Sequence, residues 1–361
     1  MERIVNLYLR GMEFGEPQVY EDMVLFPVRS RLNPGPDYIT LSEALERGVL
    51  EVSEVSEGGS VPELKATNKG QKPTLMIDGE ELKGAKQNRV LNTTIMVAPG
   101  TTVIIPVSCV EAHRWHGHTL SMGKSDHVMA HGIRTKKMEQ VHQNLETNRS
   151  FRANQDEIWA DIDFMAYRLH VESPTSAMSD IYEARAKDLE DYLKAFSLVE
   201  GQKGLLVFIG GKPVGLEFIS REEAFSRLYQ KLLKSYVLEA VSLKYEELMR
   251  QERKKSSRKE NEQKSNAKMR KTKAIPGVEK ALAFVEKAVG AQEKRYPSIG
   301  MGYSCRYLGN KVVGAALEVD GSIPHLAFFA VENGNRSQKK NSPDENFPRL
   351  RIRRGYLFEK D

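Results

Sequence analysis

Residues 94–107 read TIMVAPGTTVIIPV, with two short apolar runs on either side of Pro99-Gly100. Runs rich in Val, Ile and Thr and bounded by Gly, Pro or Asn predict β-strands. The same pattern recurs through the first 112 residues, in runs at Met23–Val28, Val49–Val55, Thr74–Ile77, Thr94–Val97 and Val103–Val107. A capping box at Thr40–Glu43, followed by Gly48, predicts one short helix among these strands. The first third of the chain is therefore predicted to be strand-rich.

The middle of the chain has the hydrophobic period of helices. From about residue 126 to 198, apolar residues such as Ile158, Ile162 and Leu169 fall on one stripe. Ser173-Pro174 is typical of a helix N-terminus, and this helix is expected to end near Phe196.

The second half alternates between the two patterns. Residues 204–219 are strand-like, and a capping box at Ser220–Glu223 predicts a long helix through about Met249. A further helix is expected at 276–291 and strands at 301–331. The fold class is α+β, with mixed sheets built from β-hairpins, a helical middle section and a long helix near 220–250.

These patterns divide the chain into five parts, which we expect to form one compact domain. They are a strand-rich part at 1–120, a helical part at 121–200, a hairpin and long helix at 201–250, a basic segment at 251–275, and a helix with closing strands at 276–361.

Three segments, 76–84, 208–215 and 307–314, share an apolar pair, a Gly-containing turn and a second Gly. Each predicts a β-hairpin. The similarity is either a duplicated unit or a coincidence among common hairpins, and the sequence leaves both open.

Composition excludes several classes of protein. Of 361 residues, 40% are hydrophobic and 29% charged, as in soluble globular proteins. The apolar runs are far shorter than the roughly 20 residues of a membrane span, so no membrane partner is expected. Cys109 and Cys305 are the only cysteines, too few for a disulfide framework, and they indicate a reducing, cytoplasmic location.

The net charge of +5 is concentrated in one segment. Residues 250–273 hold eleven Lys or Arg and three Glu, a net of +8, which leaves −3 for the rest. Because this run lacks aromatic residues, we expect a solvated helical extension or linker; nucleic-acid binding through 250–273 is possible but not favoured.

The densest cluster of chemically active side chains is at 78–92, DGEELKGAKQNRVLN. Crowded carboxylates raise one another's pKa, which is how a general acid or base is made, so Glu80 and Glu81 are candidate catalytic residues. Amides and Arg recognise polar groups by paired hydrogen bonds. The expected ligand-binding residues of this run are Asp78, Lys86, Gln87, Asn88, Arg89 and Asn92.

A second cluster follows the strand that ends near Cys109. Glu111 is a third candidate catalytic carboxylate, while Arg114 and Trp115 are suited to pair with and stack on a phosphorylated or aromatic ligand. Cys109 ends an apolar strand and is expected to be buried and unreactive. We expect 78–92 and 108–115 to be neighbours that line one polar cleft.

Histidines are concentrated between His113 and His131. His127 and His131 would share a helical face as metal ligands, but the Glu of the zinc-protease motif is missing, so no metal site is assigned. The P-loop, nucleophile-elbow, dinucleotide-binding and CxxC motifs are absent, and the cofactor is unknown.

Most of the chain resembles a domain family named for its association with ADP-ribosylglycohydrolases and rhodanese-phosphatases. The family elements are Val52-Ser-Glu54, Val61-Pro62, Asp78-Gly-Glu80-Glu81, Gly84-Ala-Lys86-Gln87-Asn88-Arg89, Asn92-Thr93, Ile105-Pro-Val-Ser-Cys109-Val-Glu111, Arg114-Trp115, Gly210-Gly211 with Gly215, and His325-Leu326 with Phe328. The basic run 250–273 and His116 and His118 depart from the family pattern.

The resemblance implies nucleotide, ADP-ribose or RNA-end metabolism, including RNA repair, without an established reaction. The leading hypothesis is a hydrolase with a Glu general acid/base acting on such a substrate. The alternative is a non-catalytic module that binds a nucleotide or a protein partner, and a third interpretation is a buried polar network that only stabilises the fold. The oligomeric state is not indicated by the sequence.

Overall fold

The computed structural model describes residues 3–115, 121–258 and 275–331, and the side chains of 252–258 are outside this description. Within Met1–Val331 the described residues belong to one compact unit. His116 and His118 lie outside the described residues, as does the basic run beyond Arg258.

The helices are α1 Ile4–Arg10, α2 Leu41–Glu46, α3 His131–Asn148, α4 Gln155–Arg168, α5 Met178–Ala184, α6 Ala186–Ala195, α7 Glu222–Arg258 and α8 Val278–Val289. The strands are β1 Glu13–Phe14, β2 Gln18–Tyr20, β3 Met23–Arg29, β4 Ile39–Thr40, β5 Leu50–Glu54, β6 Glu63–Asn68, β7 Thr74–Met76, β8 Glu80–Gly84, β9 Arg89–Leu91, β10 Ile95–Val97, β11 Thr102–Cys109, β12 Met122–Val128, β13 Gly204–Ile209, β14 Lys212–Ile219, β15 Gln292–Pro297, β16 Tyr303–Gly309, β17 Val312–Val319 and β18 Ser322–Ala330. The α+β fold class is confirmed.

The strands form three sheets. Sheet 1 has nine antiparallel strands in the order β1-β3-β13-β14-β18-β17-β16-β15, with β2 paired to β3. Sheet 2 has the order β10-β7-β4, and its β4–β7 pair is parallel. Sheet 3 has the order β12-β8-β9-β11-β6-β5.

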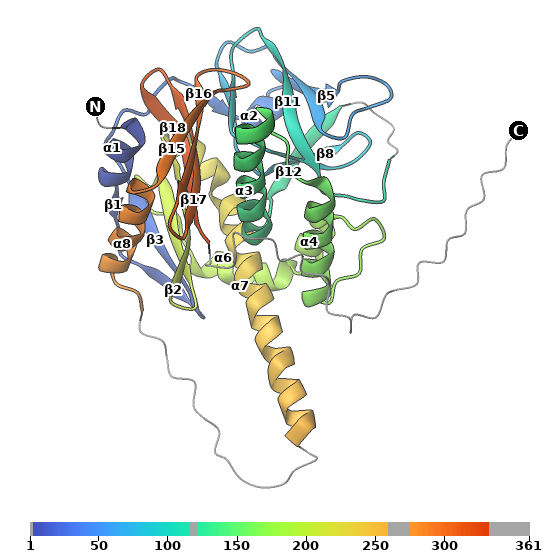
Figure 1. Cartoon of the computed structure of the whole chain (residues 1–361), viewed down its shortest axis with the longest axis vertical. Coiled ribbons are helices and arrows are strands. Elements are labelled where there is room, and N and C mark those ends of the chain that lie inside the picture. The colour runs from blue at the N-terminus through green and yellow to red at the C-terminus, as the bar shows by residue number, and fades with distance from the viewer. Residues whose placement is uncertain (1–2, 116–120, 259–274, 332–361) are drawn as a thin grey trace, which may run out of the picture. The chain divides into compact units, whose positions relative to one another are not determined.

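Both faces of sheet 1 are covered, which explains why the central strand β13, GLLVFI, is buried at every position and has no polar side chain. Leu206 and Phe208 of β13 face α1 and α8, whereas Leu205 and Val207 face the core that includes α3 and α7 (Figure 1). A separate core inside sheet 3 packs against α2. Alternate residues of one strand thus enter two different cores.

Several predicted elements are confirmed. Thr40 Oγ1 accepts a hydrogen bond from the Glu43 amide at α2, and Gly48 follows with φ 65°. The hairpins β13–β14 and β16–β17 correspond to two of the three repeat segments. The long helix is α7, which continues to Arg258, nine residues beyond the predicted end at Met249, and extends away from the sheets in Figure 1.

Other predicted elements are wrong. The segment 76–84 is not a hairpin, because β7 belongs to sheet 2 and β8 to sheet 3. Residues 122–128 form β12, paired with β8, so His127 is on a strand and His131 opens α3; they share no helical face. Ser173 accepts a hydrogen bond from the Ala177 amide, and the single helix predicted to end near Phe196 is two helices, of which α5 begins at Met178 and α6 ends at Ala195. Local hydrogen bonding of Ser173 thus delays the helix by one turn.

None of the described helices combines the length and apolar character needed to cross a membrane.

Candidate functional site

The chain passes from sheet 2 to sheet 3 through a tight turn at Asp78-Gly79. The Glu80 amide donates to the Ile77 carbonyl at 3.1 Å, and Gly79 has φ 80°. A Cβ atom on Gly79 would lie 2.8 Å from Arg134 Cδ. Glycine is therefore required both by the backbone conformation and by the close approach of Arg134.

Asp78 is directed into the interior. Its Oδ1 lies 2.5 Å from Lys137 Nζ and 3.7 Å from Arg134 Nε, both on α3. Its amide donates to Thr94 Oγ1 at 3.0 Å. Asp78 is 1% exposed, so this carboxylate links α3 to the turn and is not accessible to a ligand from the surface.

Glu80 and Glu81 are also fully buried and paired. Glu80 Oε1 lies 3.0 Å from Lys231 Nζ of α7, and the same ammonium donates to Ser42 Oγ. Glu81 Oε2 accepts from Ser125 Oγ and lies 3.3 Å from His127 Nδ1. The crowding of carboxylates seen in the sequence is thus relieved by partners from α7 and β12.

Three polar side chains join 78–92 to 108–115, which lie side by side as expected. Gln87 Nε2 donates to the Glu111 carbonyl at 2.8 Å. Asn88 Oδ1 accepts from Arg114 Nη2 at 3.1 Å, and the Asn88 backbone amide donates to Glu111 Oε2 at 3.2 Å. Asn92 Oδ1 accepts from Ser108 Oγ at 2.7 Å. All three side chains are buried, so they position backbone rather than line a cleft.

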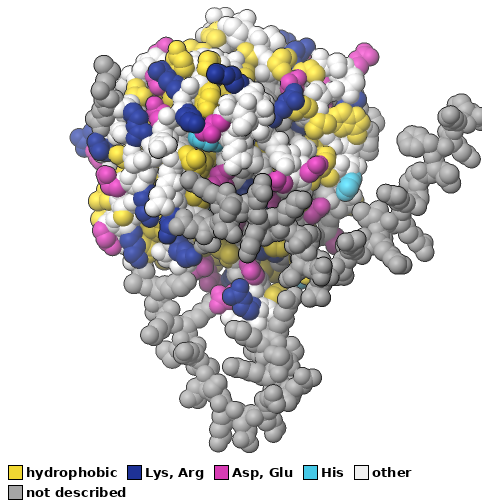
Figure 2. Space-filling model, in the orientation of Figure 1, with side chains coloured by type: hydrophobic (Ala, Val, Ile, Leu, Met, Phe, Trp, Pro, Cys, Tyr) yellow, Lys and Arg dark blue, Asp and Glu magenta, His cyan; other side chains and the backbone are white. Residues whose placement is uncertain are grey.

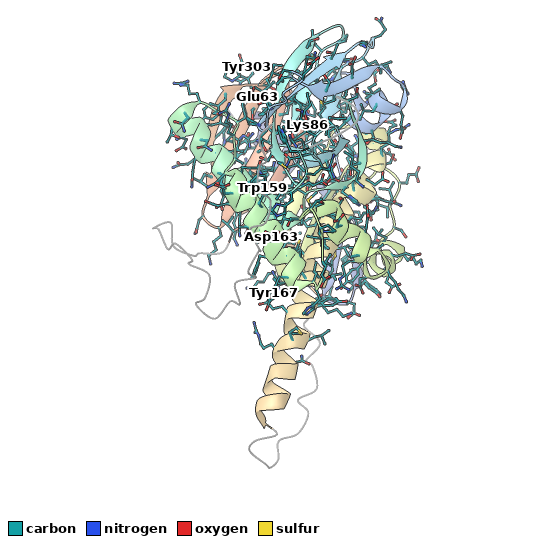
Figure 3. The ribbon with its side chains drawn as sticks, turned by 90° about the vertical axis from the view of Figure 1, so that its right-hand side faces the viewer. Glu63, Lys86, Trp159, Asp163, Tyr167 and Tyr303 are labelled. Atoms are coloured by element: carbon teal, nitrogen blue, oxygen red, sulfur yellow. The ribbon has the colours of Figure 1, made fainter. Side chains whose placement is uncertain are left out.

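The motif reaches the surface at what we call the Trp115 rim, formed by Lys86, Arg89, Glu111, Arg114 and Trp115. The Trp115 ring is 43% exposed and lies 5.7 Å from Lys86 Nζ and 5.6 Å from Arg89 Cζ. Arg114 Nη2 lies 2.6 Å from Glu111 Oε2. Figure 3 labels Lys86 on this side of the molecule.

The charges at the rim are unequal. Arg89 is buried, and its Nη2 lies 3.9 Å from Glu54 Oε1, beyond hydrogen-bond distance. Burial lowers the pKa of Arg89. Burial raises the pKa of Glu111, but hydrogen bonds from Arg114 and the Asn88 amide outweigh it, so its pKa is below the ordinary value. With Glu54 included, the three cations Lys86, Arg89 and Arg114 lie near two carboxylates, Glu54 and Glu111.

Cys109 is buried, and its Sγ donates to the Glu111 carbonyl. Burial raises the pKa of its thiol, so it is neutral at pH 7. His113 is exposed and lies beyond the end of β11 at Cys109.

A second set of charged residues consists of Asp78 and four residues that were not singled out from the sequence. We call it the inter-sheet cluster: Asp78, Arg134, Lys137, Glu217 and Arg306, all 1% exposed or less. Arg134 donates two hydrogen bonds, of 2.5 and 3.1 Å, to the carboxylate of Glu217 in β14. Arg306 of β16 donates to Thr93 Oγ1 at 2.6 Å. A charged residue inside an apolar strand, such as Glu217 in GLEFI, was the signal that could have revealed it.

His325 borders the cluster, and its Nδ1 lies 2.7 Å from Thr94 Oγ1. Burial raises the pKa of Glu217, but Arg134 and His325 outweigh it and lower the pKa to about 2. Burial lowers the pKa of Lys137 to about 8. Lys137 remains mostly protonated at pH 7, so the cluster holds three positive and two negative charges.

Among the described residues, no three His, Cys, Asp or Glu side chains are placed to hold a metal ion. Two grooves lie away from the predicted site residues. One of about 450 Å³ is bounded by residues of 45–52 and 121–124. Another of about 600 Å³ is bounded by residues of 62–63, 104–106, 144–152 and Ile299.

No curated protein and no solved structure matches the chain. A family model, described as the ARG and Rhodanese-Phosphatase-superfamily-associated Protein domain, matches residues 11–329, which include both polar runs and the inter-sheet cluster. The chain therefore belongs to this domain family, as the sequence motifs had indicated.

Proposed function

We propose that the protein binds a nucleotide or ADP-ribose-like small molecule at the Trp115 rim, as a non-catalytic module. The observation that carries the proposal is the exposed Trp115 ring with the cations of Lys86 and Arg89 within 6 Å of its centroid. An aromatic ring offers a surface for a base, and the partly exposed Lys86 offers charge to phosphate, whereas the buried Arg89 lies against the ring from inside the protein. The rim therefore provides both parts of nucleotide recognition.

The burial of the motif carboxylates favours binding over hydrolysis. A general acid or base must come within hydrogen-bond reach of the reacting atom. Glu80 and Glu81 are fully buried and paired with Lys231 and with Ser125 and His127. We therefore assign these two carboxylates to stabilising the fold. This agrees, for this part of the motif, with the interpretation that it is a buried polar network.

Glu111 is the motif carboxylate at the rim, and a hydrolase would use it as a general base. Its Oε2 contacts Arg114 at 2.6 Å, and its Oε1 accepts from Thr175 Oγ1 at 3.1 Å. These contacts keep it ionised, and an ionised, fully engaged carboxylate is suited to positioning Arg114. We assign Glu111 that role.

The test is calorimetric titration with ADP-ribose, AMP, ADP and a 5′-phosphorylated RNA end. We expect Trp115→Ala and Lys86→Ala to weaken binding by roughly tenfold or more, since stacking of a base on an aromatic ring contributes about 1–3 kcal/mol and a hydrogen bond to a charged group about 1.5–3 kcal/mol. Tyr303→Ala is the matched control, because Tyr303 is 44% exposed and lies under Arg295 at 3.7 Å, at another place on the surface (Figure 3). Equal affinities for all three variants and wild type would refute the site.

Measuring turnover distinguishes a non-catalytic binding module from a hydrolase. Wild-type protein should leave all four compounds intact, with or without divalent metal. Conversion of any of them, lost in Glu111→Gln while binding is kept, would establish the hydrolase instead.

Nucleic acid is the less favoured partner. On the face shown in Figure 2, Lys and Arg side chains are interspersed with Asp and Glu rather than gathered in one patch. Nonspecific nucleic-acid binding relies on continuous positive charge. A cytoplasmic location and participation in RNA repair remain predictions from the sequence.

A further inference from the structure

Arg306 is a charged side chain without a matching anion among the described residues. It is fully buried, and its Nη2 donates to Thr93 Oγ1. Its Nε and Nη1 have no hydrogen-bond partner, and no carboxylate of the described residues lies within 4 Å of it. Burying a cation costs several kcal/mol unless an opposite charge compensates it.

The surroundings of Arg306 are rich in donors. Asn92 Nδ2 is likewise buried without a partner. Asp78, the nearby carboxylate, already bonds Lys137 at 2.5 Å. The inter-sheet cluster has one positive charge in excess, so the group that would complete it is an acceptor with negative charge.

The 600 Å³ groove lies directly beside this place. Phe151 borders the groove, and Arg306 Cζ lies 5.6 Å from its ring. Pro106 also borders the groove, and its carbonyl accepts from the backbone amide of Asn92 at 3.1 Å. The contact with Phe151 therefore places the Arg306 guanidinium behind the groove wall, and the backbone bond places residue Asn92 beside Pro106.

The groove itself carries cations. Arg149 and Arg152 border it, and both are exposed. Glu63 is paired with Arg152 at 3.3 Å. Phe151 stands between these arginines in the chain, on the connection between α3 and α4, and is 8% exposed. Arg149 has φ 51° because it is the left-handed C-cap of α3, where its amide donates to the Asn144 carbonyl.

We propose that this groove is a second binding site, specific for the phosphate group of a small molecule. The exposed Arg149 and Arg152 attract the ligand into the groove. A rotamer change of Phe151 then gives access to Arg306. The phosphate accepts hydrogen bonds from Arg306 Nε and Nη1 and from Asn92 Nδ2. A guanidinium binds phosphate through two parallel hydrogen bonds, so the free edge of Arg306 matches this ligand. The site is separate from the Trp115 rim and does not depend on the function proposed there.

The experiment is calorimetric titration of the full chain with inorganic phosphate, pyrophosphate and ribose 5-phosphate, with chloride at constant concentration. We expect wild type to bind at least one of them and Arg306→Lys to weaken binding by tenfold or more. Arg149→Ala with Arg152→Ala should weaken binding severalfold without affecting folding, because both side chains are exposed. Phe151→Ala should accelerate association.

The controls identify each way in which the proposal fails. Trp115→Ala should leave phosphate binding at the groove unchanged, and the Arg149/Arg152 variant should leave binding at the Trp115 rim unchanged. If Arg306→Lys does not fold, the Arg149→Ala/Arg152→Ala variant and Phe151→Ala test whether phosphate binds in the groove. Absence of binding in both wild type and Phe151→Ala, or binding that none of the groove variants alters, overturns the proposal and leaves water as the partner of Arg306.

Discussion

Lys137 Nζ lies 2.5 Å from Asp78 Oδ1, in a part of the interior where neither side chain has more than 2% of its surface exposed. The same ammonium donates to the Leu91 carbonyl at 2.6 Å. One side chain of α3 therefore holds both ends of the 78–92 motif, at the turn that opens it and at the strand that closes it. The carboxylates of the motif are directed into the interior of the protein, and Trp115 lies at its exposed edge.

Removing one member of this pair should destabilise the fold strongly. Asp78→Asn or Lys137→Met leaves the other group buried and uncompensated, at a cost of about 3–5 kcal/mol in the free energy of unfolding. The double variant should cost less than the sum of the two, which urea denaturation would measure. The exposed pair Lys69–Glu51, at 2.7 Å, is the control and should contribute less than about 1 kcal/mol. Full additivity at Asp78 and Lys137 would contradict the coupling.

Glu80 and Trp115 should show opposite effects. Glu80→Gln removes the charge that compensates buried Lys231, so the free energy of unfolding should fall by about 3 kcal/mol. Ligand affinity of the folded protein should stay within twofold of wild type. Trp115→Ala should retain the melting temperature and lose affinity. A folded Glu80→Gln protein with strongly reduced affinity would show that this carboxylate contributes to ligand binding.

Acid should destabilise the protein through His131. Burial lowers the pKa of His131 to about 4, and its Nε2 lies 3.0 Å from the Val214 carbonyl, with Tyr236 stacked on the ring and Glu217 and Arg134 nearby. Between about pH 6.5 and 4 the unfolded chain takes up a proton here and the native protein does not, so stability falls as the pH falls.

The loss from His131 should approach roughly 3 kcal/mol near pH 4. His131→Gln removes the titration, so the difference between its unfolding free energy and that of wild type should change with pH across this window. A constant difference from pH 7 to 4 would contradict a neutral buried His131.

The thiols of Cys109 and Cys305 should be unreactive in the native protein. Both are buried, and burial raises the pKa of Cys109 and raises that of Cys305 to about 12. An aromatic disulfide reagent should modify them only at the rate of unfolding, and Cys109→Ala should retain ligand binding. Rapid native modification, or loss of binding in a folded Cys109→Ala protein, would give the thiol a functional role.

Residues 259–273 should be dispensable for folding, because their composition offers almost no apolar surface to bury. Replacing them with a Gly/Ser linker of equal length should change the melting temperature by less than about 2 °C. A larger decrease would show that these residues contribute to the stability of the rest of the chain.

Local sequence patterns were sufficient where the determining interactions are local. The cap at Thr40, the hairpin turn at Gly210-Gly211 and the apolar stripe that becomes α4 depend on neighbours within a few residues, and each was predicted correctly. The helical period was predicted to begin at about residue 126, but pairing with β8, some 40 residues away, makes 122–128 a strand. Long-range pairing outweighs propensity in such short segments.

By itself, the sequence determined the α+β class, the family and the adjacency of 78–92 to 108–115, because periodicity, turn residues and motif order are written in the chain. Only the tertiary structure decided which of the motif's charges are accessible. Asp78 pairs with Lys137 on α3, Glu80 with Lys231 on α7, and Glu81 with His127 on β12. Arg306 lies behind a groove formed by segments that are far apart in the sequence. The energetic role of a charge depends on its desolvation and on its partner, and both are set by residues far away in the sequence.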